Sequence, residues 1–328
     1  MTGFSTTDPS LMTEPWTGTV ERPYFTDDMS PTEDWDSSEE TTDNILSCFS
    51  IFISLWGLVG NGIIICFLGF RIQRNKYTIY ILNLAVADFL FLLCSSVALL
   101  LNLPLIAHHH FPHVPQQVHR VLHILYVFGY NTNQYLLTAI SAERCLSILY
   151  PLWYRCWRPK HLSTALCAVL WALASLVTGI EYFFCTSTFY FPESPTLQAM
   201  KPRSCPAVSI FTGVLTFLVF TPIMVTSSLT LLIKVQTSSQ RRNPPKFYII
   251  IVFSVALFLT CSLSFRLFLF IENYYYHELL NDVVFDCFLL LSIFNSCINP
   301  VVYFYLGNCR VRRPLKEVLQ GVFKDDII

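Results

Sequence analysis

Long apolar stretches alternate with short polar segments along most of this chain. Seven of these stretches are long enough to cross a bilayer whose hydrocarbon core is about 30 Å thick. Their expected bounds are 46–70, 78–103, 118–150, 162–184, 207–233, 247–272 and 283–306. Because a chain in lipid must satisfy its backbone polar groups internally, the pattern predicts an all-α membrane protein, a seven-helix transmembrane bundle.

The two ends of the chain differ from this apolar middle. Residues 1–44 are rich in acidic, Ser, Thr and Pro residues, which predicts a disordered acidic tail. Residues 307–328 begin with interspersed basic and apolar residues, which favours a short amphipathic eighth helix on the membrane surface, followed by a short tail. The transmembrane domain should therefore occupy 45–306.

Composition and charge narrow the class of protein and its orientation. With 53% hydrophobic and 13% charged residues, the chain is too apolar for an ordinary soluble protein. Most Lys and Arg residues lie in the loops around 71–76, 155–160, 234–246 and 310–324. By the positive-inside rule these loops face the cytoplasm, so the N-terminus should be extracellular and the C-terminus cytoplasmic. We expect a multi-pass plasma-membrane protein with no nucleic-acid partner.

Polar residues and a proline interrupt the ends of the third and seventh stretches. Glu143 and Arg144 close the third stretch, and Asn299, Pro300 and Tyr303 close the seventh. A membrane helix carries such residues where they face the bundle interior and serve a function. No nucleophile–base or metal-ligand spacing stands out elsewhere, so the two motifs favour a signalling receptor over a pump, a channel or an enzyme.

One carboxylate lies near the middle of the second stretch. An ionised Asp88 at this depth is opposed by about 3 kcal/mol or more, so it needs partners. The polar residues able to face it are Asn133, Asn295, Ser296 and Asn299. One interpretation is a neutral, hydrogen-bonded Asp88 that only fixes helix packing.

The ordered set of motifs over about 45–325 resembles the rhodopsin-like (class A) G-protein-coupled receptors. The marks are Asn61, Leu-Ala-Val-Ala-Asp at 84–88, Glu143-Arg144, Trp171 and Pro222. Within that class, residues 128–160 resemble the Mas and Mas-related receptors, close to Mas. Their hallmark is Glu-Arg-Cys, here at 143–145, where most relatives have Asp-Arg-Tyr.

This resemblance implies a receptor that converts binding of an extracellular ligand into activation of a heterotrimeric G protein, with Gq or Gi favoured. It implies that Arg144 swings to the G protein, that Leu152 inserts into it, and that Tyr303 turns inward as the seventh helix rearranges about Pro300. It also implies that the polar cluster around Asp88 holds a sodium ion in the resting state. No other cofactor is expected.

The extracellular disulfide departs from the class A pattern. The usual cysteine at the top of the third helix is replaced by His119. Mas-related receptors use an arrangement that corresponds here to Cys185–Cys205, which would close a loop of about twenty residues, worth about 3 kcal/mol. Spacing alone leaves Cys48 and Cys287 open as partners.

The sixth stretch departs from the pattern as well. Residues 261–264 read Cys-Ser-Leu-Ser where the class has Cys-Trp-x-Pro, so both the Trp and the kinking Pro are missing. No acidic residue lies in 240–247, which leaves Arg144 without its usual resting-state partner on this helix. We therefore expect measurable ligand-independent signalling.

The candidate ligand-binding charges are Glu181 and Arg266. An acid at the position of Glu181 takes basic peptides and cationic drugs in Mas-related receptors, and Ser209 stands where some of them have a second acid. A buried Arg266 must pair, either with a ligand carboxylate or internally with Glu181. The residues offering aromatic contacts are Tyr126, Tyr130, Tyr182 and Phe265. The predicted ligand is a peptide or a cationic small molecule.

Two other functions are alternatives to the receptor. A transporter should show repeated halves and broken helices at matched positions, and the sequence has no internal repeat. A non-signalling scaffold that pairs with other receptors is favoured by the altered sixth stretch, while the intact Glu143-Arg144 motif and the 299–303 motif favour signalling.

Overall fold

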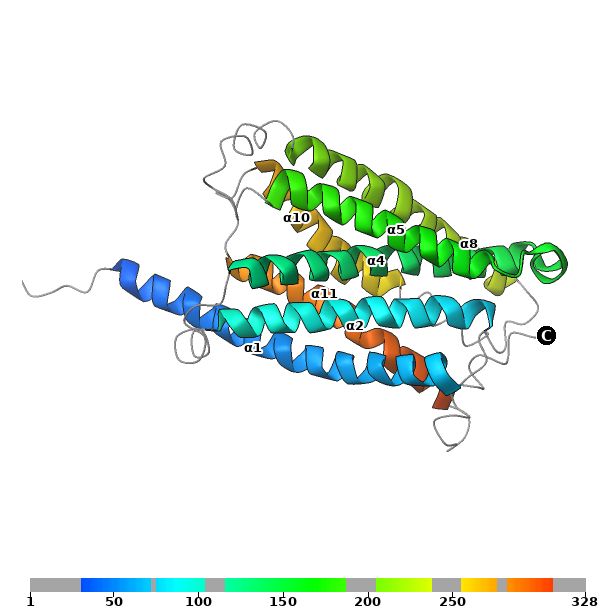
Figure 1. Cartoon of the computed structure of the whole chain (residues 1–328), viewed down its shortest axis with the longest axis horizontal. Helices are drawn as coiled ribbons and strands as arrows, with labels where there is room; N and C mark the ends of the chain where they lie inside the picture. Colours follow the sequence, from blue (N-terminus) through cyan, green and yellow to red (C-terminus); the bar gives the residue numbers. More distant parts are fainter. Residues whose placement is uncertain are drawn as a thin grey trace, which may run out of the picture. The chain divides into compact units, whose positions relative to one another are not determined.

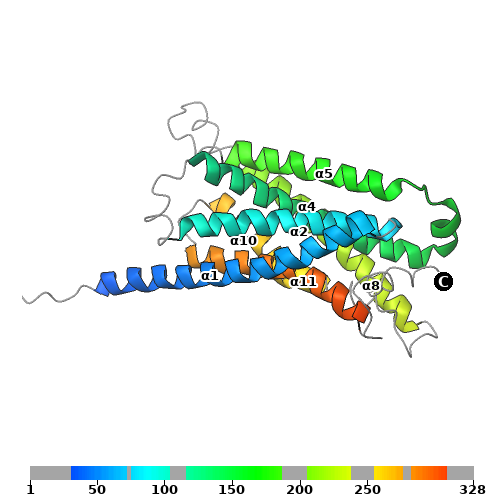
Figure 2. The same ribbon diagram turned by 60° about the horizontal axis from the view of Figure 1, so that its bottom comes forward.

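The computed structural model describes residues 31–71, 75–103, 116–186, 205–237, 255–275 and 282–308, and within these ranges it contains helices and no strand. The chain divides into two units, Met1–Ser38 and Glu39–Ile328. Only 31–38 of the first unit is described, as helix. The second unit contains the helical bundle shown in Figures 1 and 2.

Each of the seven predicted transmembrane stretches falls on a helix in its described part; of 247–272, the structure describes 255–272. The first four spans are α1 (Pro31–Cys66) with a π-helical turn at Phe67–Arg71, α2 (Lys76–Asn102), α4 (Gln116–Leu149), and α5 (Leu162–Glu181) with a π-helical turn at Tyr182–Thr186. The fifth span starts as a helix at Cys205 and passes through a π-helical stretch at Val214–Phe220 into α8 (Thr221–Thr237). The sixth contains a π-helical turn at Phe258–Ser262 that leads into α10 (Leu263–Tyr275), and the seventh is α11 (Asp282–Asn308). The seven-helix fold class is confirmed.

Helix length and hydropathy alone identify fewer spans than the fold contains. Among the described residues, five helices are long and apolar enough to cross a membrane: Thr41–Phe70, Lys76–Asn102, Leu162–Cys185, Cys205–Lys234 and Val283–Val302. Helix α4 is not among them because it carries the polar run at 131–134 and the Glu143-Arg144 pair. This helix packs against α2, α5 and α8, so its polar side chains face protein rather than lipid.

The first helix begins earlier than predicted. Residues 31–44 were expected to belong to a disordered tail, but α1 begins at Pro31. Proline suits the first position of a helix. The structure thus has helix over 31–44, where the sequence predicted a disordered tail, and 1–30 lies outside the described residues.

A glycine allows α2 and α4 to approach closely. A Cβ atom added at Gly129 would lie 2.9 Å from the backbone nitrogen of Phe91 and 3.1 Å from the carbonyl oxygen of Ala87. Both of these atoms belong to the α2 backbone, so no side-chain movement would relieve the contact. This close approach brings the middle of α4 against Asp88, which is fully buried.

Prolines accompany some irregular turns of the described spans but not others. The π-helical stretch at Val214–Phe220 ends two residues before Pro222, whereas α11 continues as α-helix through Pro300. The sixth span has no proline in 255–275, yet it contains the π-helical turn at Phe258–Ser262. The sequence lacks the usual signal for a bend in this helix, but its hydrogen-bond ladder is still irregular at the same place.

Some predictions fall beyond the described residues. Helix α11 ends at Asn308, so the amphipathic helix expected over 307–328 lies almost entirely outside the described part of the chain. Residues 240–247 also lie outside it. The backbone of Tyr303 is helical within α11.

Candidate ligand and coupling sites

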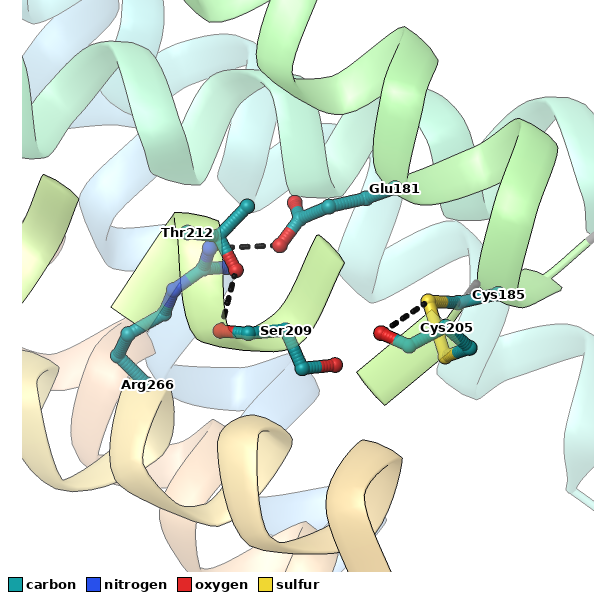
Figure 3. The surroundings of a disulfide bond; sticks show 6 residues. All are labelled: Glu181, Cys185, Cys205, Ser209, Thr212 and Arg266. Carbon is teal, nitrogen blue, oxygen red and sulfur yellow. Dashed lines mark hydrogen bonds and ion pairs between the residues drawn. A yellow bond between two sulfur atoms is a disulfide. The ribbon is translucent and has the colours of Figure 1, made fainter. Parts of the chain in front are cut away.

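A disulfide joins the ends of the fourth and fifth spans. Cys185, in the π-helical turn after α5, is bonded to Cys205, with 4.9 Å between their Cα atoms. Both residues are buried, whereas Cys48 and Cys287, the alternatives that spacing left open, are exposed free cysteines. The expected Cys185–Cys205 pairing is confirmed (Figure 3).

A buried ion pair lies one helical turn from this disulfide. Arg266 on α10 reaches α5, where its Nη2 lies 2.6 Å from Oε1 of Glu181 (Figure 3). The Arg266 side chain is 3% exposed and that of Glu181 is 13% exposed. Of the two partners predicted for Arg266, the structure therefore shows Glu181.

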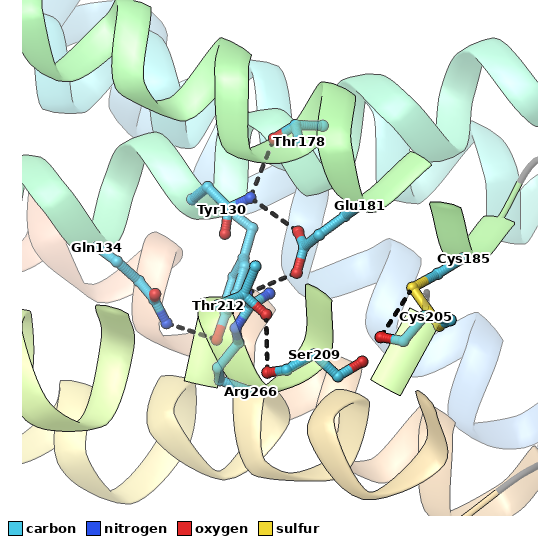
Figure 4. Close-up of polar contacts among 10 residues, drawn as sticks. Tyr130, Gln134, Thr178, Glu181, Cys185, Cys205, Ser209, Thr212 and Arg266 are labelled. Carbon is cyan, nitrogen blue, oxygen red and sulfur yellow. Dashed lines mark hydrogen bonds and ion pairs between the residues drawn. A yellow bond between two sulfur atoms is a disulfide. The ribbon is translucent and has the colours of Figure 1, made fainter. Parts of the chain in front are cut away.

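Polar residues of α4 extend this ion pair into a network. The Asn131 side chain donates to Oγ1 of Thr178 at 3.0 Å and to Oε2 of Glu181 at 3.4 Å. Nearby on α4, Gln134 donates to the hydroxyl of Tyr130 at 2.6 Å (Figure 4). Sequence reasoning missed Asn131, Thr178 and Gln134, although four polar residues in a row at 131–134 are a signal inside an apolar span.

The predicted aromatic residues are only partly brought together. The ring centroids of Tyr130 and Phe265 lie 5.2 Å apart in an edge-to-face contact, and Tyr130 lies beside the ion pair (Figure 4). Tyr126 is buried against the ring of His123 at 5.0 Å. Tyr182 is half-buried in its π-helical turn, and no ring contact within the described ranges joins it to the other three. Ser209 lies on the fifth span near the disulfide (Figure 3), where its backbone oxygen accepts from Thr212.

A second polar cluster surrounds Asp88 in the middle of the bundle. Asn133 of α4 donates to one carboxylate oxygen, and Asn299 of α11 donates to the other at 2.9 Å. Ser296 lies beside the same carboxylate. Asn295 is also buried, but no hydrogen bond between it and Asp88 occurs in the described part of the chain. The predicted set is therefore assembled around Asp88, with Asn295 next to it in sequence but not bonded to it.

Amide oxygens are the unusual feature of this cluster. The side-chain oxygens of Asn61, Asn133, Asn295 and Asn299 are buried and accept no hydrogen bond from the residues described. Buried polar atoms of this kind are rare in folded proteins. Carboxylate and amide oxygens are the kinds of ligand that hard cations prefer.

The third site contains the Glu143-Arg144 motif at the far end of α4. Oε1 of Glu143 accepts from the Tyr80 hydroxyl at 3.0 Å and from Nη2 of Arg158 at 2.8 Å. The side chain of Arg158 is fully buried, although the sequence indicated only a basic loop residue. The Arg144 guanidinium lies 3.6 Å from the centre of the Tyr77 ring. Sequence reasoning missed Tyr77, Tyr80 and Arg158 as partners of the motif.

The loop after α4 also displays a free apolar residue. Leu152, predicted to insert into the G protein, is 78% exposed, which leaves its side chain available to a partner. Leu152 follows Tyr150 and Pro151 and precedes the π-helical turn Trp153–Trp157.

Comparison with known proteins identifies the family. The family described as "7 transmembrane receptor (rhodopsin family)" matches residues 60–303. The chain is 41% identical to "Proto-oncogene Mas" of Mus musculus over 281 residues, 84% of this chain and 82% of that protein. It is 44% identical to "Mas-related G-protein coupled receptor member H" of Mus musculus over 304 residues, 90% of this chain and 88% of that protein. It is 38% identical to "Mas-related G-protein coupled receptor member D" of Macaca fascicularis over 291 residues, 86% of each.

With its seven helices and these matches along most of its length, the chain belongs to the rhodopsin family of seven-transmembrane receptors and, within it, to the Mas-related G-protein-coupled receptors of the plasma membrane, which are receptors and not enzymes.

Proposed function

We propose that this receptor binds a peptide or a small cationic ligand at Glu181 and Arg266 and couples to Gq or Gi. In this proposal the disulfide end of the bundle faces the outside of the cell and the Glu143-Arg144 end faces the cytoplasm. The basic loops predicted from the sequence support that orientation. The observation that carries the ligand proposal is the buried Glu181–Arg266 ion pair one turn from the Cys185–Cys205 disulfide.

The ion pair limits the chemistry of the ligand. A cationic group that takes Glu181 must displace the Arg266 guanidinium from it. Breaking a buried pair by removing one partner costs about 3–5 kcal/mol, because the remaining charge stays buried and uncompensated. A ligand meets this cost when it also offers an acceptor to Arg266, and a carboxylate is the best match for a guanidinium. A basic peptide with a free C-terminus satisfies both charges.

The Asp88 cluster is proposed to hold a sodium ion. The Asp88 carboxylate and the buried amide oxygens of Asn133 and Asn299 supply oxygen ligands of the kind that a hard cation prefers. A bound cation stabilises the conformation to which it binds more tightly. Sodium is therefore expected to favour the resting receptor.

Ligand-independent signalling is part of the proposal. The resting contacts of Arg144 within the described residues include the Tyr77 ring of α2. A cation–π contact contributes roughly 0.5–2 kcal/mol, which is a weak restraint for a motif that must move. A fraction of receptors should therefore adopt the active packing without ligand.

The test compares signalling by the wild type, Arg144→Ala and Glu181→Gln at matched surface expression. Inositol phosphate and cyclic AMP are measured unstimulated and with basic peptides that have either a free or an amidated C-terminus. We expect unstimulated output that depends on Arg144, and a peptide response that depends on Glu181 and on the free carboxylate. Glu181→Gln responding like the wild type to every active peptide would refute the binding site, and equal output from Arg144→Ala would refute coupling through this motif.

A further inference from the structure

We infer that Arg158 is a positioning residue that holds the Glu143-Arg144 motif in its resting place, through a clamp formed with Lys76, Tyr77 and Tyr154. The inference rests on the proposed function, because it takes this end of the bundle as the G-protein side. The clamp joins the start of α2 to the loop after α4.

The sequence fixes one half of the clamp at the start of α2. Oδ1 of Asn75 accepts from the backbone nitrogens of Tyr77 and Thr78, at 3.0 and 2.8 Å. The Asn75 nitrogen in turn donates to Oγ1 of Thr78 at 2.7 Å, which completes a capping box. Tyr77 therefore lies in a well-defined first turn, and the Arg144 guanidinium lies 3.6 Å from the centre of its ring.

The other half comes from the π-helical turn Trp153–Trp157. Tyr154 and Arg158, four positions apart, are the buried residues of 153–158, and the intervening Arg155, Cys156 and Trp157 are exposed. The two buried side chains face the bundle on the same side of this turn. The loop therefore turns a specific pair of residues inward.

Aromatic contacts hold the two halves together. The rings of Tyr77 and Tyr154 stack with centroids 5.8 Å apart and an interplanar angle of 19°. Nζ of Lys76 donates to the carbonyl oxygen of Tyr154 at 3.1 Å and lies 5.1 Å from the centre of its ring. Burial is the main reason that the pKa of the Tyr154 hydroxyl lies well above its usual range, so this ring stays neutral in the stack.

Arg158 closes the clamp onto the motif itself. Its Nη2 donates to Oε1 of Glu143 at 2.8 Å and to Oγ of Ser163 at 2.7 Å, and Ser163 donates to the carbonyl oxygen of Lys76 at 3.0 Å. Burial alone would lower the pKa of Arg158, but the hydrogen bond and the charge of Glu143, together with Tyr154 and Tyr80, outweigh burial and raise that pKa. One guanidinium nitrogen thus connects α4, α5 and the start of α2.

The geometry also explains why this contact can be released. Oε2 of Glu143 and Nε and Nη1 of Arg158 make no hydrogen bond to any residue that the structure describes. A buried polar network that is only partly satisfied is weaker than a complete one. The clamp is therefore incomplete enough for a bound G protein to displace it.

The experiment measures ligand-independent nucleotide exchange on a panel of purified G proteins, in membranes matched for receptor number. Arg158→Ala is compared with the wild type, with Arg158→Lys, and with Arg155→Ala. Arg155→Ala is the matched control, because it removes the same charge from an exposed position of the same loop. We expect Arg158→Ala to raise exchange at least about fivefold, at the lower end of allosteric couplings. Arg158→Lys should raise it less, and Arg155→Ala should leave it unchanged.

A thermal double-mutant cycle keeps the test independent of signalling. Glu143→Gln and Arg158→Ala are each expected to lower the melting temperature, and the double variant should melt at a temperature well above that given by adding the two shifts. Additive shifts in melting temperature would overturn the clamp. It would also be overturned if the wild type signals and Arg158→Ala leaves nucleotide exchange unchanged or lowers it. Silence of every variant on every G protein, with the thermal coupling intact, would overturn both the proposed coupling function and the restraining role.

Discussion

Removing one charge of the Glu181–Arg266 pair should destabilise the receptor far more than removing both. The Arg266 side chain is 3% exposed, and Nη2 lies 2.6 Å from Glu181. In Glu181→Gln the guanidinium keeps its charge without a counterion, which is expected to cost about 3–5 kcal/mol. The double variant Glu181→Gln/Arg266→Met leaves no buried charge, so its stability should lie within about 1–2 kcal/mol of the wild type.

The measurement is thermal unfolding of purified receptor in one detergent. With a shift of about 2 °C for each kcal/mol, as for the larger domains studied, Glu181→Gln should lower the melting temperature by roughly 6–10 °C. The double variant should recover most of that loss. Part of the network is independent of the charge on Glu181, because Asn131 also donates to Thr178 at 3.0 Å.

Two outcomes would refute this reasoning. If Glu181→Gln melts like the wild type, the guanidinium has another counterion or enough water, and the pair cannot set the chemistry of the ligand. If the double variant is as unstable as the single variant, the lost stability comes from packing and not from an uncompensated charge. The Arg155→Ala variant serves as a control for loss of an exposed arginine.

Three further predictions test other parts of the structure. Gly129→Ala should destabilise the receptor by about 1–3 kcal/mol, because the added Cβ would lie 2.9 Å from the α2 backbone. Gly179→Ala is the control: its Cβ would have no atom within 4 Å, so it should be neutral or slightly stabilising in the same melting experiments. Replacing both Cys185 and Cys205 by Ser should cost about 2–5 kcal/mol, measured as a lower melting temperature that added reductant no longer changes. Replacing choline chloride by sodium chloride should raise the melting temperature of the wild type but not of Asp88→Asn; equal shifts would place the sodium effect elsewhere.

The apolar pattern was sufficient to predict the helices of this bundle. Length and hydropathy predict most of the spans because a membrane helix needs about 20 apolar residues. The described apolar helix of the sixth span, Val255–Ile271, is shorter than that, and α4 is too polar by the hydropathy of the helix. Its polar residues are tolerated because α2, α5 and α8 surround it. The early start of α1 at Pro31 was missed because acidic composition was given more weight than the helix-start signal.

Partners were harder to predict than positions. Asp88 and Asn299 are 211 residues apart, yet their contact was predicted, because both are polar groups at matching depths in apolar helices. The contact between Glu143 and Arg158 spans 15 residues and was missed. Arg158 lies in a polar loop, where a basic residue is normally exposed, and only the turn at Trp153–Trp157 directs it inward. A periodic pattern identifies buried faces of long helices, but not of a five-residue turn.

Helix α4 is the element common to all three polar sites. It contributes Asn131 to the Glu181 network, Asn133 to the Asp88 cluster and Glu143 to the Arg158 contact. At a rise of about 1.5 Å per residue, the first and last of these lie about 18 Å apart along one helix. The partners differ at each level. Asn131 bonds Glu181 of α5, which in turn pairs with Arg266 of α10. Asn133 bonds Asp88 of α2, which also accepts from Asn299 of α11. Glu143 bonds Tyr80 of α2 and Arg158 of the loop after α4. A ligand that separates Arg266 from Glu181 therefore also disturbs the hydrogen bond between Glu181 and Asn131. Because α4 is a rigid helix, a small rotation or shift at Asn131 also moves Asn133 and Glu143. Side chains alone would have to relay the same change through a tightly packed core, where such displacements are small. Asn133 and Asp88, at the middle level, are thus placed where a bound cation can oppose that motion.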